Sequence, residues 1–335
     1  MEKSPDVFLL VLRIYRKLKD NIEMTVSVVI VTIKAKDYIK SCLDSLLEQT
    51  HLPFEIMVMD NSSQPDFIRE LNRLYPSVKI YSSTNNLFYT GALNKGIQLA
   101  QGEFILCLND DVILDQGFIQ ESLEGFLIKK NIGMVSGKIL RQDKKTLDST
   151  GLFLSVWRTA KERGYGQPDL GQFDKSGFIF GVSGSAAFYR KDMLEAVKNK
   201  LDYFDPDFRM FYEDLDISWR AQKYGWLAYY VPTALIYHVR GGSFRPDSGI
   251  DKTIARKYLS DQLHCDLIKN RYLTILKNET FFSFLLHLIP ILIYDLCVWT
   301  YVIFFQPKVI KLFFSCSFAK INEKMHKQRL FKKRF

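Results

Sequence analysis

Apolar β-branched runs alternate with segments of helical periodicity over the first third of the chain, and this alternation limits the possible folds more than any other feature. Val26–Val31 is continuous and β-branched, which is typical of a strand buried on both faces of a parallel sheet. The further predicted elements are strands at Glu55–Met59, Val78–Tyr81 and Phe104–Leu108, and helices at Ile39–Leu47, from about Pro65, and at Gly91–Ala100. Strands that alternate with helices predict an α/β fold with a doubly wound, mostly parallel sheet and helices on both faces.

Polar side chains follow two of these predicted strands at the point where each strand ends. Asp60 comes directly after the second strand, and Asn109-Asp110-Asp111 follows the fourth. Ligands of such sheets bind beyond the carboxyl ends of the strands, so we expect Asp60 and Asp111 to meet in one crevice. One carboxylate there can accept hydrogen bonds from a nucleoside, and another can hold Mg²⁺ against a diphosphate. Capping of a strand-to-helix turn is the alternative role for the second group.

A second acidic cluster, formed by Glu213, Asp214 and Asp216, opens a predicted helix that ends near Tyr224. The helix dipole favours acids in the first turn, so capping alone explains the cluster. Acids beside aromatic side chains can also give one carboxylate a raised pKa, which suits the deprotonation of a hydroxyl group. His238 ends a predicted strand and is followed by the polar segment Gly241-Gly242-Ser243. It is either a metal or phosphate ligand or a structural histidine.

Strand signals continue less regularly in the second half of the chain. Gly177–Tyr189 is small and strand-like, and two short strand-like runs, Leu227–Val231 and Ala234–His238, flank Pro232. We therefore predict one domain over residues 25–245. It is preceded by a prefix (1–24) that is either an amphipathic helix or irregular, and it is followed by a helical, membrane-associating region (246–335).

The segment Phe281–Phe305 is long and apolar, with Asp295 as its one formal charge. Its length permits a membrane span, but Asp295 is costly at depth and Pro290 would kink a helix there. One or two helices lying in the membrane interface are favoured, and a packed helical hairpin is the alternative.

Net charge is concentrated behind this segment. The formal charge of the chain is +9, and residues 306–335 alone hold nine Lys or Arg and one Glu, whereas residues 24–250 are close to neutral. A basic tail beside an apolar segment favours an anionic membrane surface over nucleic acid as partner. The five cysteines are scattered without a C-x-x-C pair, so neither a disulfide framework nor a zinc site is expected.

Six blocks, in this order along the chain, resemble nucleotide-sugar glycosyltransferases of the inverting family 2, which have the GT-A fold. The subgroup that the chain resembles is that of rhamnosyltransferase-like members in bacterial cell-surface polysaccharide assembly. The blocks are VSVVIVT (Val26–Thr32), DNSS (Asp60–Ser63), NLFYTGALNKGI (Asn86–Ile97), GEFILCLNDD (Gly102–Asp111), FDPDFRMFYEDLDISWRAQKYGW (Phe204–Trp226) and YHVRGGS (Tyr237–Ser243). They imply a GT-A sheet with a C-terminal helical extension, and a transfer of a sugar from a nucleotide diphosphate sugar to a glycan or lipid-linked acceptor.

On the donor side, the resemblance implies that Thr32 and Asp60 line the nucleoside pocket. Asp111 matches the second acid of the D-x-D element, a ligand of Mg²⁺ or Mn²⁺ and of the diphosphate, with Asp110 beside it on the donor. His238 matches a histidine near the diphosphate and is a second candidate metal ligand.

On the acceptor side, the resemblance implies that Asp214 is the general base. Gly184 and Glu213 fall where the acceptor and the donor sugar meet. The implied location is the cytoplasmic face of the cell membrane, either peripheral or with one C-terminal membrane segment.

Three positions depart from the family pattern. Thr32 is followed by Ile33-Lys34 instead of Tyr-Asn, Asn109 occupies the first D-x-D position, and Phe88 replaces the usual glycine after Asn-Leu.

Two other enzyme classes lack their motif here, because the turn after the first strand has neither the G-x-G-x-x-G of dehydrogenases nor the basic glycine-rich loop of nucleotidyltransferases. A non-catalytic sugar-nucleotide-binding protein or scaffold of a membrane assembly remains the alternative function.

Overall fold

The structure is a computed structural model that describes residues 24–33, 38–62, 64–239, 259–317 and 321. The prediction for the prefix 1–24 therefore falls, except for Met24, outside the described residues. So do Gly241-Gly242-Ser243 and most of the basic tail.

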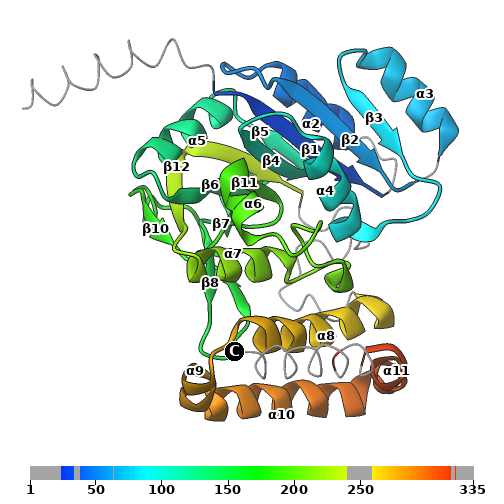
Figure 1. Ribbon diagram of the computed structural model, residues 1–335, viewed down its shortest axis with the longest axis vertical. Coiled ribbons are helices and arrows are strands. Elements are labelled where there is room, and N and C mark those ends of the chain that lie inside the picture. Colours follow the sequence, from blue (N-terminus) through cyan, green and yellow to red (C-terminus); the bar gives the residue numbers. More distant parts are fainter. Residues whose placement is uncertain (1–23, 34–37, 63, 240–258, 318–320, 322–335) are drawn as a thin grey trace, which may run out of the picture.

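A mixed sheet forms the centre of the molecule (Figure 1). Its strand order is β10-β12-β6-β11-β4-β1-β2-β3, with β5 paired to β12 and β7 to β6. The strands are β1 (Val26–Thr32), β2 (Glu55–Asp60), β3 (Lys79–Ser82), β4 (Phe104–Asn109), β5 (Val112–Leu114), β6 (Ile132–Arg141), β7 (Leu147–Ser149), β10 (Gly177–Ile179), β11 (Ala186–Arg190) and β12 (Leu227–His238). The neighbours β4, β1, β2 and β3 are parallel, whereas β11 runs antiparallel to both β4 and β6. A separate hairpin pairs β8 (Leu152–Leu154) with β9 (Ala160–Glu162).

Helices cover both faces of the sheet, because the side chains of each buried strand alternate between two apolar cores. In β1, Val28 and Ile30 belong to one core and Val29 and Val31 to the other. The first core is closed by α2 (Tyr38–Leu47), α3 (Pro65–Leu74) and α5 (Phe118–Leu127). The second is closed by α4 (Phe88–Leu99), α6 (Lys191–Val197) and α7 (Glu213–Lys223). The predicted doubly wound α/β fold is confirmed.

Two predicted strand regions differ in detail from the structure. Gly177–Tyr189 is two strands, β10 and β11, separated by the irregular segment 180–185. The two runs around Pro232 form one strand, β12, whose register against β6 shifts between Val231 and Leu235. Proline has no N–H to donate to a strand ladder, so it is tolerated at such an irregularity.

A C-terminal helical layer lies against the end of the domain that carries α7 (Figure 1). It consists of α8 (Asp261–Asn278), α9 (Phe281–Leu286), α10 (Leu288–Phe305), α11 (Pro307–Leu312) and a π-helical turn at Phe313–Ser317. The apolar segment is therefore two helices, which meet at His287. Pro290 lies in the first turn of α10, where a missing N–H breaks no helical hydrogen bond.

Candidate functional site

The carboxyl ends of β1, β2 and β4 bring the predicted donor-side residues together. Thr32 pairs in register with Asp60, and Val31 with Asn109. The Thr32 hydroxyl donates to Asp110 Oδ2 at 2.6 Å. The convergence that we expected from the strand ends is thus present.

Asp60 has one carboxylate oxygen engaged and one available. Its Oδ1 accepts the Ser62 backbone N–H at 2.8 Å. Its Oδ2 is buried and has no hydrogen-bond partner among the described residues. Because a buried, unpaired carboxylate oxygen is costly, this atom is suited to accept a hydrogen bond from a ligand.

Asp111 and His238 lie together at the same edge, with a third residue behind them. His238 Nε2 is 3.3 Å from Asp111 Oδ1, and His238 Nδ1 is 2.8 Å from Asp148 Oδ2. Burial lowers the pKa of His238, but the carboxylates of Asp111 and Asp148 outweigh burial and raise that pKa to about 10. Asp148, on β7, was not predicted. Its partner His238 lies 90 residues further along the chain, so no local sequence pattern indicates the contact.

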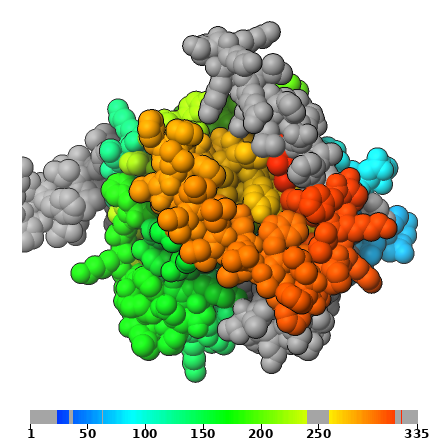
Figure 2. All heavy atoms as spheres, turned by 90° about the horizontal axis from the view of Figure 1, so that it is seen from below, coloured from blue at the N-terminus to red at the C-terminus, as the bar shows by residue number. Residues whose placement is uncertain are grey.

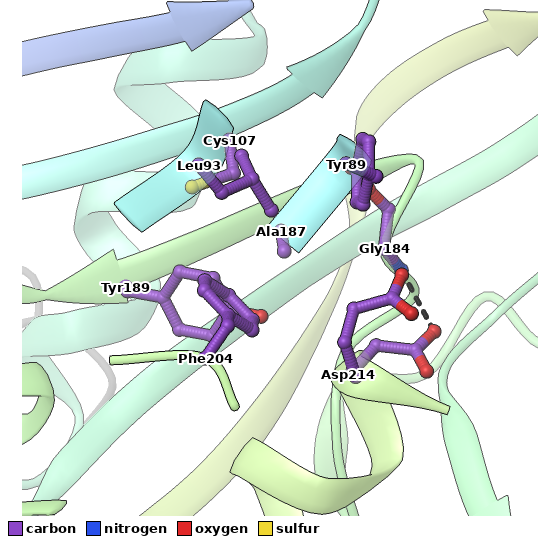
Figure 3. A pocket seen from close by; sticks show the side chains of 9 residues that line it. Tyr89, Leu93, Cys107, Gly184, Ala187, Tyr189, Phe204 and Asp214 are labelled. Carbon is purple, nitrogen blue, oxygen red and sulfur yellow. Dashed lines mark hydrogen bonds between the residues drawn. The ribbon is translucent and has the colours of Figure 1, made fainter. Parts of the chain in front are cut away.

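The residues predicted for the acceptor side, Gly184, Glu213 and Asp214, line one pocket at the start of α7 (Figure 3). Asp214 Oδ2 accepts the backbone N–H of Gly184 at 3.1 Å, and Asp214 Oδ1 accepts that of Leu215 at 2.7 Å. Burial, followed by the charge of Asp214, raises the pKa of Glu213 to about 8. At neutral pH the buried pair therefore favours a single negative charge, shared between the two carboxylates.

Tyr89 connects the donor edge to the acceptor side, and sequence reasoning missed it. Its hydroxyl lies 3.0 Å from Asn109 Oδ1 and 2.9 Å from Gly184 O, so it bridges β4 and the segment that contacts Asp214. The neighbouring Phe88 has a φ of 56°. That left-handed backbone explains why glycine is usual at this position. The departure at Phe88 was thus the signal that this turn is constrained.

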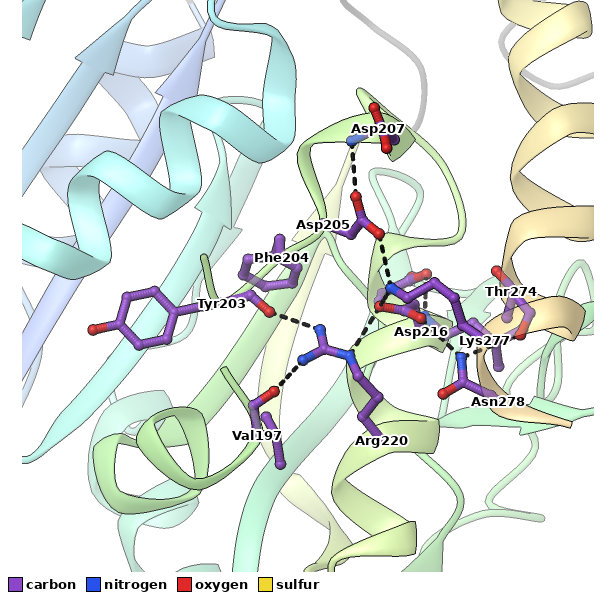
Figure 4. Close-up of polar contacts among 12 residues, drawn as sticks. Val197, Tyr203, Phe204, Asp205, Asp207, Asp216, Arg220, Thr274, Lys277 and Asn278 are labelled. Carbon is purple, nitrogen blue, oxygen red and sulfur yellow. Dashed lines mark hydrogen bonds and ion pairs between the residues drawn. The ribbon is translucent and has the colours of Figure 1, made fainter. Parts of the chain in front are cut away.

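Asp216 is separate from this pocket. It accepts hydrogen bonds from Arg220, Lys277 and Asn278, which tie α7 to α8 (Figure 4). Burial alone would raise the pKa of Asp216, but Lys277 and Arg220 hold it below its usual value. Its role in the structure is an anchor between two helices.

The fit of a divalent metal rests on Asp111 and His238. In the part of the chain that the structure describes, no three His, Cys, Asp or Glu side chains form a metal cluster. His238 Nε2 is nevertheless buried and makes no hydrogen bond among those residues, and it faces Asp111 Oδ1 at 3.3 Å. A carboxylate on the other ring nitrogen, as Asp148 provides, is the usual support of a metal-binding histidine. Two protein ligands beside a diphosphate fit Mg²⁺ or Mn²⁺.

Comparison with known proteins gives the family. The family model of Glycosyl transferase family 2 matches residues 27–198, which is more than half of the chain. The chain belongs to glycosyl transferase family 2. This family 2 protein is 25% identical over 244 residues to N-acetylglucosaminyl-diphospho-decaprenol L-rhamnosyltransferase of Mycobacterium tuberculosis, an alignment that covers 64% of the chain and 76% of the relative.

Solved structures support the GT-A fold. A mannosyltransferase from Pyrobaculum calidifontis, solved with GDP-Man and Mn²⁺, superposes with a TM-score of 0.51 at 16% identity, covering 91% of this family 2 chain and 79% of that chain. TarS of S. aureus superposes with a TM-score of 0.51 at 15% identity, and the match covers 77% of this chain but only 40% of TarS.

Proposed function

We propose that this family 2 glycosyltransferase moves a sugar from a nucleotide diphosphate sugar to a hydroxyl of a glycan or lipid-linked acceptor, with inversion, in the synthesis of a cell-surface polysaccharide. The observation that carries the proposal is the contact series Asn109–Tyr89–Gly184–Asp214, which joins the donor edge to a buried carboxylate. Rhamnose is the first donor sugar to test, because the Mycobacterium tuberculosis relative is named as a rhamnosyltransferase of a lipid-diphosphate acceptor.

Asp214 takes the proton of the acceptor hydroxyl in a single displacement. The acceptor oxygen bonds to the anomeric carbon while the bond from that carbon to the diphosphate oxygen breaks, so the configuration inverts. The proton goes to Asp214, and the negative charge leaves on the nucleotide diphosphate. The backbone N–H groups of Gly184 and Leu215 both donate to Asp214, and such contacts favour the charged form of a carboxylate, which is the form that a general base needs.

The donor side binds and orients the nucleotide. Asp60 Oδ2 is available to accept a hydrogen bond from the nucleoside, and Thr32 fixes Asp110 beside it. Asp111 and His238 would hold a divalent metal, with Asp148 orienting the histidine. When bound, the metal supplies positive charge to the departing diphosphate.

A donor screen tests the catalytic proposal. The full chain is incubated with a panel of nucleotide sugars and a lipid-linked acceptor, and the released nucleotide diphosphate is measured, with Asp214→Asn as the matched control. We expect one donor to be turned over in an acceptor-dependent way, and NMR of the product to show the inverted anomer. Nucleotide binding without turnover of any donor would contradict the proposal and favour a non-catalytic, sugar-nucleotide-binding protein.

The proposed location is the cytoplasmic face of the membrane, with α9 and α10 lying in its interface. Figure 2 shows α9 to α11, in orange and red, on one face of the molecule. Exposed apolar side chains gather on these helices, namely Phe281, Phe282, Leu285, Leu286, Ile289, Leu292, Ile293, Leu296, Ile303, Phe304 and Phe305. Lys308 and Lys311, exposed on α11, add positive charge beside this apolar face.

Contacts with α8 favour this in-plane arrangement over a span. α10 is long and apolar enough to cross a membrane. However, one side of it is packed through Ile291, Val298 and Val302, and its Asp295 pairs with Arg271 of α8. A spanning α10 would either break this pair or draw the polar helix α8 into lipid, and both are costly.

Vesicle flotation of the full chain tests the membrane proposal. We expect binding to anionic vesicles, partial release by high salt, and loss of binding in Leu292→Glu. Leu170→Glu is the matched control, because Leu170 is also an exposed leucine but lies in a loop of the sheet domain. Complete resistance to salt would indicate that α10 spans the membrane. If the parent protein does not bind vesicles, the membrane proposal is wrong and α9 and α10 are a packed helical hairpin.

A further inference from the structure

The four residues before α7, Arg209 to Tyr212, form a loop that delivers Glu213 and Asp214 to the pocket. Three of them have a positive φ without being glycine: φ is 59° at Arg209, 70° at Phe211 and 68° at Tyr212. Non-glycine residues rarely adopt this conformation, and they keep it only where the surroundings hold it. The loop therefore needs an external support.

α8 supplies that support through a row of buried polar side chains. Asn270 Nδ2 donates to three backbone carbonyls of the loop and its approach, those of Phe208 at 2.7 Å, Met210 at 2.6 Å and Phe211 at 2.8 Å. Its two N–H groups are shared among the three oxygens, and the side chain is completely buried. One amide thus fixes the backbone on both sides of Arg209.

Two neighbours on the same face of α8 secure the approach to the loop. Asp266 accepts hydrogen bonds from Arg209 at 2.7 Å with both carboxylate oxygens. Lys269 donates to the backbone carbonyl of Asp207 at 2.7 Å. The positions 266, 269 and 270 have the spacing of one helix face, so a rigid element carries all three contacts.

The loop also contacts the donor side of the pocket. The backbone carbonyl of Arg209 accepts the N–H groups of Tyr89 and Thr90 at 3.0 and 3.2 Å. Tyr89 is the residue that bridges Asn109 and Gly184. A shift of the loop would therefore displace both Asp214, which follows it, and Tyr89, which it holds.

We infer that Asn270 is a positioning residue for the transfer reaction: it holds the 209–212 loop in the strained form that places Asp214. This inference rests on the proposed function for its kinetic consequence. The contact itself is independent of any donor. It also makes the C-terminal layer part of the active enzyme, since α8 packs against α10 and α11 on its other sides.

Kinetics of the full chain with the donor found active test the inference. We expect Asn270→Ala to lower kcat about tenfold or more, because a misplacement of about 1 Å is enough for such losses, while the donor KM stays within about twofold. Asn270→Ser keeps one donor group and should recover part of kcat. Gln262→Ala, at an exposed position of the same helix, is the matched control and should match the parent.

Hydrogen exchange supplies a readout that needs no donor. Amides of residues 205–216 should exchange faster in Asn270→Ala and Asn270→Ser than in the Gln262→Ala control, with β1 and β4 unchanged. Unchanged exchange in this segment, or a kcat equal to that of the control, would overturn the inference. An equal loss in kcat and donor affinity together with a lower Tm would also overturn it, because that result indicates a general structural role. Absence of turnover in the parent would reject the proposed function alone, and the exchange result would still decide whether Asn270 holds the loop.

Discussion

The two sides of the candidate site are built differently. The donor edge consists of residues at the carboxyl ends of buried parallel strands, such as Thr32, Asp60 and Asp111, and neighbouring strands bring them together. The acceptor side depends on a strained loop whose carbonyls are held by α8, a helix some sixty residues further along the chain. The donor edge is therefore formed by the sheet topology, whereas the acceptor side is formed by the packing of α8 against the loop.

This difference has a functional consequence. A strand end is fixed by the hydrogen-bond ladder on both sides, so single substitutions there remove a chemical group without moving its neighbours. The loop before α7 is fixed by a few side-chain contacts from another layer. Substitutions in that layer are therefore expected to act on the reaction from a distance.

The largest expected effect comes from removing Asp111, the proposed metal ligand of the donor edge. Asp111→Ala should abolish turnover, a loss of about 10³-fold or more, because neither the carboxylate nor the charge it binds remains at the diphosphate. Circular dichroism and Tm should stay near the parental values. Turnover of the parent that is insensitive to a chelator would contradict the metal assignment, though it would leave the fold unchanged.

The second effect tests the acceptor side directly. Asp214→Asn keeps the shape of the side chain but removes the proton acceptor, so kcat should fall about 10²- to 10⁴-fold. Donor affinity, measured by titration calorimetry, should barely change because the proposed role of Asp214 is to deprotonate the acceptor. Near-normal turnover would move the base to Glu213, since Asp216 is already held by Arg220, Lys277 and Asn278.

The third effect tests the bridge between the two sides. Tyr89→Phe removes one hydroxyl that contacts Asn109 and Gly184, and it leaves the ring in place. The loss of such a hydrogen bond is worth on the order of 1 kcal/mol, so kcat should fall about five- to tenfold. Tyr229→Phe, whose hydroxyl bonds Ser176 at an exposed site, is the matched control. Equal kinetics for the two variants would show that the sides act without this bridge.

Sequence reasoning reached the donor edge because its signals are local. A strand-like run followed by Asp60, or an apolar run followed by Asn109-Asp110-Asp111, predicts both the strand and the place of the carboxylates. The doubly wound fold followed from the same alternation. The proposed metal site was predicted only in part, since Asp148 contacts His238 from a short strand whose sequence has no clear periodicity.

The α8 interface was not predictable for a physical reason. Asn270, Asp266 and Lys269 are polar residues on a helix, a pattern that normally indicates a solvated face. Here they are buried because the loop carbonyls and Arg209 need partners. The loop and the α8 residues that bind it lie in different segments of the sequence, so only the folded chain shows that they are partners.

The smallest expected effect concerns stability, and it tests the protonation of Glu213 beside Asp214. Burial and Asp214 raise the pKa of Glu213 to about 8, above the usual value of a glutamate in an unfolded chain. A raised acid pKa means that the folded state binds this proton more tightly, so stability falls as pH rises from about 4.5 to about 8. Glu213→Gln carries no charge at any pH, so it should exceed the parent in Tm by a few degrees at pH 8 and by little at pH 4.5. Thermal unfolding of both proteins across this range measures the difference, with Glu48→Gln at an exposed position as the matched control. A Tm difference that stays constant with pH would mean that the pKa of Glu213 is not raised in the folded enzyme, and the pair would then not be limited to a single negative charge.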